Sequence, residues 1–340
     1  MARVLHLVGS AVDEFFADLS RLYAADCLEV TSGGHEALVA VVAPDGTWRF
    51  PADLSPSAIA AARAVPLADA VAFLSRAGID VVVPQMFCLP GMTRYRGLFD
   101  LLGIPYLGNP PDVMALGADK ARARAVVAAA GVAVPAGEVL RPGEETSIGL
   151  PLVVKPVDAD NSVGLTFVRD PAELGQALEE AFAHSPAALV EEFVPLGREV
   201  RCGVLDRGGE LVCLPLEEYA MDPADKPVRL AADKLARDDG GDLRLVAKDP
   251  THAWIVDPTD PVTEAVWAAA RACYRALGCR HYGLLDFRID PQGEPFFLEA
   301  GLYCSFARTS VVATMAAAAG IGVRELFDGF VADTRADTLG

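Results

Sequence analysis

The chain has 340 residues, 52% hydrophobic and 22% charged, a composition typical of a well-packed globular protein of two or three domains. Its formal net charge is −18 and no basic stretch offsets it, so we expect neither nucleic acid nor a membrane as a partner. The seven cysteines lie singly and no run of 18 apolar residues occurs, which predicts a reduced cytoplasmic protein without a zinc ribbon or a membrane span.

The first third of the chain alternates between strand-like apolar runs and stretches with helical spacing. Residues 3–9 are typical of a buried strand, and the runs ALVAVVAPDG and WRF indicate further strands. A helix at roughly 57–77 then leads to the apolar run IDVVVPQMF. This alternation predicts an open α/β domain with a mostly parallel sheet, which we assign to residues 1–110. Such sheets bind ligands at the loops that follow strand ends, here residues 9–14 and 85–95.

A second domain is predicted at residues 111–195. The stretch DVMALGADKARARAVVAAAGV predicts one helix with Lys120 near its start, and the strand LVVKPV carries Lys155 at its end. A lysine at the end of a buried strand is costly without an anionic partner. The small residues of the following loop, DADNSVG, let backbone N–H groups approach a phosphate. No GxxxxGK[ST] motif occurs, so a P-loop is excluded.

The third predicted domain, residues 196–340, contains the most informative segment of the chain. The runs LLDFRI and PFFLEA, joined by DPQG, predict a hairpin that brings Asp286 and Glu299 onto one face. Two carboxylates on one face repel each other unless a cation lies between them, and magnesium with a polyphosphate is the natural candidate. The alternative is a pair of solvated surface acids, but both are embedded among Leu and Phe.

The ordered set Lys120, KPxxxxNSVG, VEEF…GREV, Asp286 and Glu299 resembles the ATP-grasp superfamily, and within it the D-alanine–D-alanine ligase group. The resemblance covers essentially the whole chain. It implies a three-domain ATP-grasp fold of class α/β, with α+β character in the ATP-grasp part and an N-terminal Rossmann-like open parallel sheet. It further implies a ligase that uses ATP with two Mg²⁺ ions, releases ADP and phosphate, and forms a homodimer.

The resemblance also implies roles for individual residues. Asp286 and Glu299 would hold magnesium, and Ser310 would bind the carboxylate of the incoming amino acid. The implied catalytic residues are Ser310, Lys234 and Asn161. Lys234 would be a further phosphate-binding lysine, and Asn161 lies in the phosphate loop. In the implied ATP site, Glu191 or Glu192 lies beside the adenine and Glu199 binds the ribose. The full set of implied ATP-binding residues is Lys120, Lys155, Ser162, Glu191, Glu192, Phe193 and Glu199.

Four positions depart from the pattern of the dipeptide ligases. Gly301 stands where they have a metal-binding Asn, and Leu284 where they have the Arg that stabilises the tetrahedral oxyanion. Asn161 replaces a serine, and Val12 replaces the Glu that holds the amine of the first D-alanine. These changes affect the first substrate more than ATP, so they indicate a different electrophile.

Longer strings, among them HLVGSAVDEF, PQMFCLPGMTRYR and LGREVRCG, resemble the D-Ala–D-Ala-ligase-like enzymes of mycosporine-like amino acid biosynthesis. This resemblance implies ATP-dependent condensation of an amino acid such as L-serine or L-threonine with mycosporine-glycine, which gives an imine sunscreen of the shinorine type. A dipeptide ligase is the alternative, and a non-catalytic ATP-binding sensor is a third reading. The implied substrate-binding residues are Gln85, Phe87, Arg94 or Arg96, Tyr303, Ser305 and Ser310. For those in the loop 85–96, packing between domains is the alternative explanation.

Overall fold

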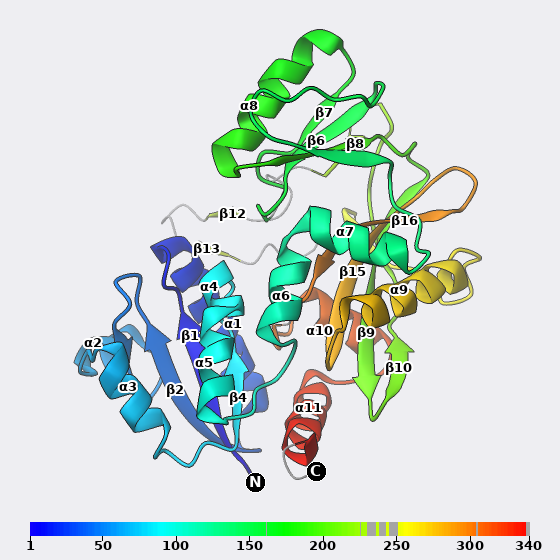
Figure 1. Cartoon of the computed structure of the whole chain (residues 1–340). Coiled ribbons are helices and arrows are strands. Elements are labelled where there is room, and N and C mark those ends of the chain that lie inside the picture. Colours follow the sequence, from blue (N-terminus) through cyan, green and yellow to red (C-terminus); the bar gives the residue numbers. More distant parts are fainter. Residues whose placement is uncertain are drawn as a thin grey trace.

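The computed structural model divides the chain among three main sheets, each covered by helices (Figure 1). The residues that the structure describes are 1–160, 162–224, 226–229, 236–237, 243–244, 251–303 and 305–337. Among these residues, no helix combines the length and apolar character that crossing a membrane requires.

The N-terminal unit contains a sheet of order β3-β2-β1-β4. Three of its strands are parallel, which confirms the predicted mostly parallel sheet, and β3 pairs antiparallel at the edge. The predicted helix at 57–77 is wrong, because Val65 instead bridges to Trp48 and the following Pro66 disfavours helical backbone before it. The elements are β1 (Arg3–Gly9), α1 (Glu14–Thr31), β2 (Glu36–Val42), β3 (Trp48–Arg49), α2 (Pro56–Ala61), α3 (Leu67–Leu74), β4 (Val81–Pro84), α4 (Leu89–Met92) and α5 (Arg94–Leu102).

Two helices, not the single predicted one, connect this unit to the central sheet. They are α6 (Pro111–Ala118) and α7 (Lys120–Ala129). The break falls at Asp119, whose extended backbone and side chain cap α7 by accepting from the Arg122 N–H at 3.0 Å. The Lys120 N–H donates to the Val157 carbonyl at 2.8 Å instead of continuing α6, which fixes the lysine beside the central unit.

The central unit is an antiparallel sheet of order β5-β8-β6-β7. One helix, α8, packs Ala177 and Ala181 against the buried side chains of the sheet. The stretch after β8, residues 193–197, leads directly into the C-terminal unit. The elements are β5 (Gly137–Leu140), β6 (Leu152–Pro156), β7 (Thr166–Val168), the 3₁₀ turn η1 (Pro171–Glu173), α8 (Leu174–His184) and β8 (Ala188–Glu192).

The C-terminal unit has a six-stranded antiparallel sheet of order β14-β11-β9-β15-β16, with β10 paired to the far end of β9. The predicted hairpin is confirmed as β15 and β16, in a register that sets Asp286 opposite Glu299. Helix α9 covers one face of the sheet through an apolar core. The elements are β9 (Arg198–Arg207), β10 (Glu210–Cys213), β11 (Glu217–Tyr219), β12 (Ala236–Arg237), β13 (Leu243–Arg244), β14 (Ala253–Ile255), α9 (Thr263–Leu277), β15 (Tyr282–Ile289), β16 (Pro295–Gly301), α10 (Val311–Ala318) and α11 (Val323–Asp337).

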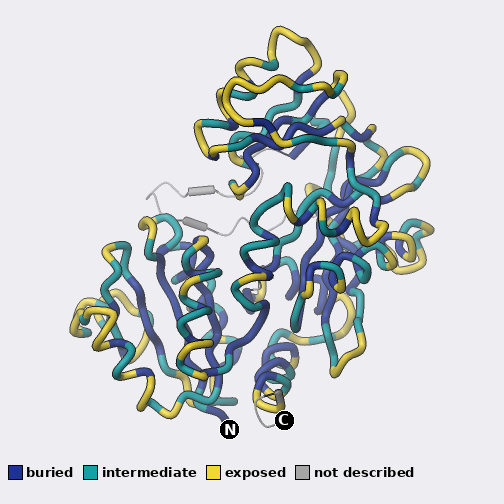
Figure 2. The backbone as a smooth tube through the Cα atoms, in the orientation of Figure 1, coloured by how far each residue is buried: buried dark blue, intermediate teal, exposed yellow. Residues whose placement is uncertain are grey.

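The C-terminal helix packs against the N-terminal sheet, so the two units share a core. Phe327 and Phe330 of α11 are 1% exposed and belong to the same apolar cluster as Val4 of β1 and Val81 of β4. The same cluster continues into β15 through Leu284. Figure 2 shows the continuous buried segments that result on both sides of this junction.

Polar contacts reinforce the junction between these units. The Asn109 amide nitrogen donates to the carbonyls of Tyr282 and Leu302 at 3.0 and 2.8 Å, and its oxygen accepts from the Arg280 N–H at 2.7 Å. His281 accepts the Gly108 N–H on Nδ1 at 2.9 Å, which requires a neutral ring unprotonated at that nitrogen. Both side chains are buried, so neither can exchange these partners for water.

We predict that Asn109→Ala lowers the free energy of unfolding by about 3 kcal/mol, because three buried hydrogen bonds lose their partner. Urea denaturation monitored by circular dichroism measures the change. Gln292→Ala, at an exposed position of the β15–β16 turn, is the control and should change stability by less than about 0.5 kcal/mol. Equal stability of the two variants would contradict the bridging role of Asn109.

The junction should also weaken in mild acid. Burial is the main cause that lowers the pKa of His281 from 6.5 to about 3, assisted by Arg280 and Arg96. Below about pH 6.5 His281 is protonated in the unfolded chain but stays neutral in the folded protein, so the free energy of unfolding falls as the pH decreases. From pH 7 to pH 5 this residue should cost about 2 kcal/mol. Urea denaturation of wild type and His281→Gln at both values tests this, and an identical pH dependence of the two proteins would refute it.

Candidate functional site

Four charged residues form one row across the C-terminal sheet. The strand register pairs Glu217 of β11 with Arg201 of β9, Arg201 with Asp286 of β15, and Asp286 with Glu299 of β16. Directly paired residues of antiparallel strands point to the same face. The neighbouring positions, such as Leu285, point to the other face and pack against α9. The row therefore faces away from α9.

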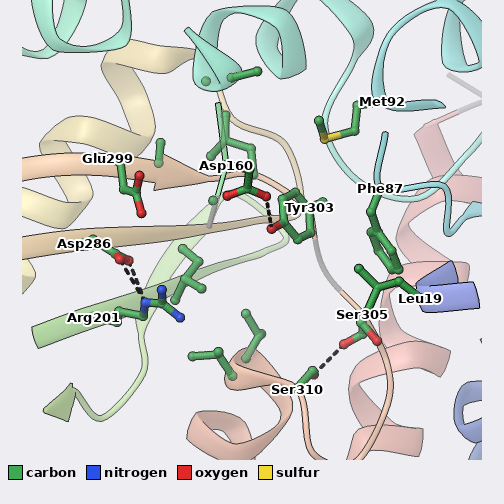
Figure 3. Close-up of a pocket in the computed structure, with 18 of the residues that line it drawn as sticks. Leu19, Phe87, Met92, Asp160, Arg201, Asp286, Glu299, Tyr303, Ser305 and Ser310 are labelled. Atoms are coloured by element: carbon green, nitrogen blue, oxygen red, sulfur yellow. Dashed lines mark hydrogen bonds and ion pairs between the residues drawn. The ribbon is translucent and has the colours of Figure 1, made fainter. Parts of the chain in front are cut away.

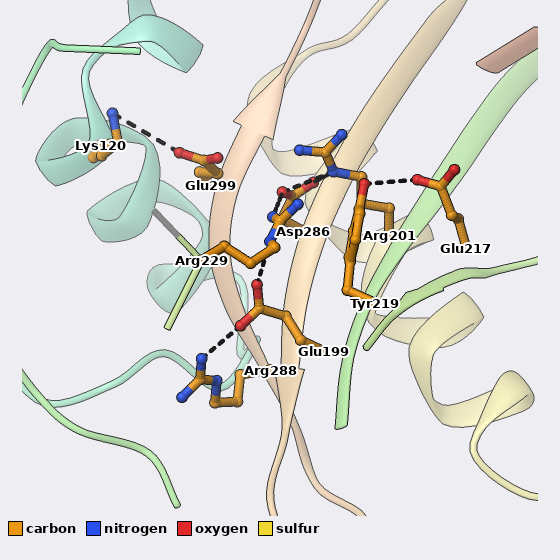
Figure 4. Close-up of polar contacts among 9 residues, drawn as sticks. All are labelled: Lys120, Glu199, Arg201, Glu217, Tyr219, Arg229, Asp286, Arg288 and Glu299. Atoms are coloured by element: carbon orange, nitrogen blue, oxygen red, sulfur yellow. Dashed lines mark hydrogen bonds and ion pairs between the residues drawn. The ribbon is translucent and has the colours of Figure 1, made fainter. Parts of the chain in front are cut away.

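A network of arginines neutralises the carboxylates of this face (Figure 4). Asp286 accepts from Nε of Arg201 at 2.9 Å and from Nη2 of Arg229 at 2.8 Å. Arg229 also donates to Glu199 at 2.6 Å, and Arg288 donates to the other oxygen of Glu199 at 2.5 Å. Burial alone would raise the pKa of Glu199, but the charges of Arg229 and Arg288 outweigh it and hold that pKa below its ordinary value.

A main cavity of about 760 Å³ lies over the charged row, between the N-terminal and C-terminal units (Figure 3). Its wall on the N-terminal side is apolar and includes Leu19, Phe87 and Met92. The Tyr303 hydroxyl donates to Asp160 at 2.9 Å, and the Tyr303 ring contacts this wall, 5.5 Å from the ring of Phe87. The Asp160 carboxylate is the main cause that raises the pKa of Tyr303 well above its ordinary value.

Ser310 and Ser305 form a polar end of this cavity. Ser310 caps α10 by accepting from the Ala313 N–H, and its hydroxyl donates to the Ser305 carbonyl at 2.6 Å. The first turn of a helix carries partial positive charge and exposed N–H groups, so an anionic group is favoured at this end of the cavity.

A second cavity of about 80 Å³ lies between the central sheet and the C-terminal sheet. Lys155 pairs with Glu191 at 2.6 Å on its central side, and Glu191 also lies 3.4 Å from Nε of Arg124. Lys120 stands where the two cavities meet, with its Nζ 3.8 Å from Glu299 and bonded to the Ala159 carbonyl. Asp286 and Glu299 also line both cavities, so the two spaces adjoin at the charged row.

The structure gathers most of the predicted site residues around these cavities. Phe87, Tyr303, Ser305 and Ser310 line the main cavity. The residues predicted to bind ATP all line the second cavity, and they are Lys120, Lys155, Ser162, Glu191, Glu192, Phe193 and Glu199. Whether these residues bind ATP stays a prediction. The predicted residues Asn161 and Lys234 lie outside the described residues.

Two of the predicted substrate-binding residues do not line the main cavity. Gln85 is fully buried and bonds to His6 at 3.1 Å, because the backbone after β4 turns this side chain into the N-terminal core. Arg94 is exposed at the start of α5 and is not part of the cavity wall. Its alternative, Arg96, is buried and donates to the Asn109 carbonyl at 2.8 Å, which supports the packing explanation for that residue.

Sequence reasoning missed Arg201, Arg229 and Asp160. The alternation of Glu199 and Arg201 along the apolar strand REVRCGVL was a usable signal, because it places two charges on one face of a buried strand. Arg229 follows no periodic pattern, so the sequence held no comparable signal for it. Asp160 is one of several small polar residues in its loop.

Two carboxylates among the described residues have the chemistry of magnesium ligands, and magnesium binding by them stays a prediction. Asp286 and Glu299 supply the oxygen ligands that magnesium prefers, from directly opposite positions. Gly301 adds no side-chain donor, and no group of three or more His, Cys, Asp or Glu among the described residues could hold a metal ion. The two carboxylates fit an ion that takes its remaining ligands from phosphate oxygens and water, which is the usual manner of magnesium.

Comparisons with known proteins agree on one family. The family model described as D-ala D-ala ligase C-terminus matches residues 136–332. A D-alanine–D-alanine ligase of Gloeobacter violaceus is 31% identical over 68% of this chain and 74% of its own. D-alanine–D-alanine ligase A of Mesorhizobium japonicum is 30% identical over 92% of this chain and 91% of its own. The structure of the D-alanine–D-alanine ligase from Coxiella burnetii is similar with a TM-score of 0.80, at 21% identity over 99% of this chain and 95% of that one.

We predict that Glu199→Ala lowers the free energy of unfolding by roughly 3–5 kcal/mol, because Arg229 and Arg288 are left as buried charges without their shared carboxylate. Thermal and urea denaturation measure this loss. Glu210→Ala removes an exposed carboxylate of the same sheet and should change little. A loss below about 1 kcal/mol for Glu199→Ala would show that the network does not stabilise the sheet.

Proposed function

This chain belongs to the D-alanine–D-alanine ligase family, and from that premise we propose that it joins two amino acids with the cleavage of ATP. Membership makes it an ATP-dependent ligase that forms C–N bonds. The proposal is carried by one observation. The cavity lined by the predicted ATP-binding residues adjoins a larger cavity at Asp286 and Glu299, where a phosphoryl group would pass between them.

The proposed reaction has two steps. The γ-phosphoryl group of ATP is transferred to a carboxylate oxygen of the first amino acid, which gives ADP and an acyl phosphate. The amine nitrogen of the second amino acid then attacks the acyl carbon and loses a proton to solvent. The C–O bond to phosphate breaks, so that an amide and inorganic phosphate are formed.

The chain's own side chains have distinct parts in this proposal. Lys120 and Lys155 neutralise the polyphosphate, and Ser310 at the start of α10 receives the carboxylate of the second amino acid. Asp286 and Glu299 would hold magnesium, which when bound shields the charge of the transferring phosphoryl group. The homodimer, the number of magnesium ions and the location of the protein stay predictions.

The wall of the main cavity favours a second candidate for the substrate that accepts the phosphoryl group. Leu284 and Gly301 line it where the dipeptide ligases are expected to have Arg and Asn, and Phe87 and Tyr303 add aromatic surface. The cavity volume of about 760 Å³ falls in the range of sites for drug-sized ligands, which exceeds what alanine needs. We therefore keep mycosporine-glycine, a cyclohexenone with an attached glycine, as the second candidate. Its ring ketone would be phosphorylated and then replaced by the amine to give an imine.

Phosphate release with ATP and magnesium separates the two candidates. Amino acids are tested singly and in pairs, then with mycosporine-glycine, while mass spectrometry and absorbance identify the products. We expect a dipeptide from amino acids alone. Phosphate release that requires mycosporine-glycine, with a red-shifted absorbance, would support the second candidate instead, and no turnover under any condition would contradict both.

In the same assay, Glu299→Ala should abolish phosphate release, because it removes a carboxylate from the meeting point of the two cavities. Glu294→Ala is the matched control, since that carboxylate is exposed at the turn of the same hairpin. Turnover of Glu299→Ala near that of Glu294→Ala would argue against the assigned site.

A further inference from the structure

We propose that Arg201 binds the negative charge that forms on the acceptor during amide formation. The inference rests on the proposed function and assigns one further residue to it. When the amine attacks the acyl phosphate, the electron pair of the C=O bond moves onto its oxygen. Collapse of that oxyanion re-forms the C=O bond and expels phosphate. A cation fixed beside the acyl carbon stabilises this state more than the substrate, and so accelerates the step.

The contacts of Arg201 leave its outer nitrogens available for a ligand. Its Nε lies 2.9 Å from both oxygens of Asp286, and this pair fixes the direction of the guanidinium. Figure 3 shows the two terminal nitrogens directed away from Asp286, and Arg201 lines the main cavity. In the described part of the chain, neither terminal nitrogen has a hydrogen-bond partner. The ring of Tyr219, 5.3 Å away, supports the guanidinium from one side.

The strand register brings this guanidinium near Leu284. Arg201 pairs directly with Asp286, and Leu284 lies two residues before Asp286 on the same face. Arg201 and Leu284 are thus diagonal neighbours, at a separation that a long side chain can span. Leu284 is followed across the sheet by Gly301, so no polar group of these two positions competes for an anion. The positive charge that Leu284 of β15 lacks is thus supplied by Arg201 of the adjacent strand β9.

The other arginine on Asp286 is bound differently. Arg229 uses both Nε and Nη2 on carboxylates, Glu199 and Asp286, and its guanidinium lies 3.9 Å from the centre of the Tyr219 ring. Arg201 commits only Nε to a carboxylate. Lys120, where the two cavities meet, is directed to Glu299 and the Ala159 carbonyl. All three cations line the main cavity, but in the described part of the chain Arg201 is the one whose terminal nitrogens are all left without a hydrogen bond.

The test compares Arg201→Met with Arg198→Met in the ligation assay. Arg198 lies on the same strand and pairs with two carboxylates, Glu218 and Asp260, away from the cavity. We expect Arg201→Met to lower kcat by about 10²–10³-fold, the usual loss for an oxyanion donor. Binding of a non-hydrolysable ATP analogue, measured by calorimetry, should change less than about threefold, because Arg201 is not part of the second cavity. Arg198→Met should retain wild-type kcat.

Two further measurements separate this role from a structural one. Exchange of ¹⁸O between the bridging and non-bridging positions of ATP reports reversible phosphoryl transfer, and it should persist in Arg201→Met because that step precedes amine attack. The double variant Arg201→Met/Leu284→Arg returns a guanidinium to the same space and should recover at least about tenfold of the lost kcat.

Three results would overturn the inference. One is a kcat of Arg201→Met within about threefold of wild type. Another is a loss of nucleotide-analogue binding as large as the loss of kcat, which would show that Arg201 acts by holding Asp286 in position. The third is loss of the isotope exchange together with kcat. If the wild-type protein itself ligates no acceptor, the proposed function fails, and that outcome is distinguishable because it is independent of the variants.

Discussion

The register between β9, β15 and β16 is the constraint on which the site depends. It aligns Arg201, Asp286 and Glu299 in one row, on the face that α9 does not cover. A slip of one residue would turn these charges into the apolar core and the core residues into the cavity. The register also explains the arginines around Asp286, since a largely buried carboxylate is costly unless charged donors surround it.

The arrangement of units then decides what surrounds this row. The main cavity lies between the C-terminal sheet and an apolar wall from the N-terminal unit, whereas the second cavity lies under the central sheet. Lys120 belongs to the site because α7 begins at a capped break and its first N–H is held by the central unit. The chemistry therefore depends on a helix boundary as much as on the strands.

The sequence predicted the parts of the site that local patterns encode. The hairpin with Asp286 and Glu299 follows from alternation and a DPQG turn, and both are local. The break at Asp119 was missed because helical spacing continues across it, while the capping by Asp119 and the distant contact with Val157 end α6 there. Gln85 was misassigned because the chain after β4 turns its side chain into the N-terminal core beside His6, whereas Phe87, two residues further on, lines the cavity. Arg201 meets Asp286 across 85 residues of chain, a pairing that no local pattern contains.

The shared core of α11, β1 and β4 has a consequence for access to the site. Because the C-terminal helix is embedded in the N-terminal sheet, and Asn109 and His281 tie the same units together, these two parts are held in one arrangement. The main cavity between them is thus bounded by two units in a fixed arrangement, and we expect its shape to select among substrates. The cavity under the central sheet, at about 80 Å³, holds only a few water molecules. If the nucleotide binds there as predicted, we expect the central unit to move away from the C-terminal sheet for nucleotide to enter, whereas the other substrate enters a cavity whose walls are already fixed relative to each other.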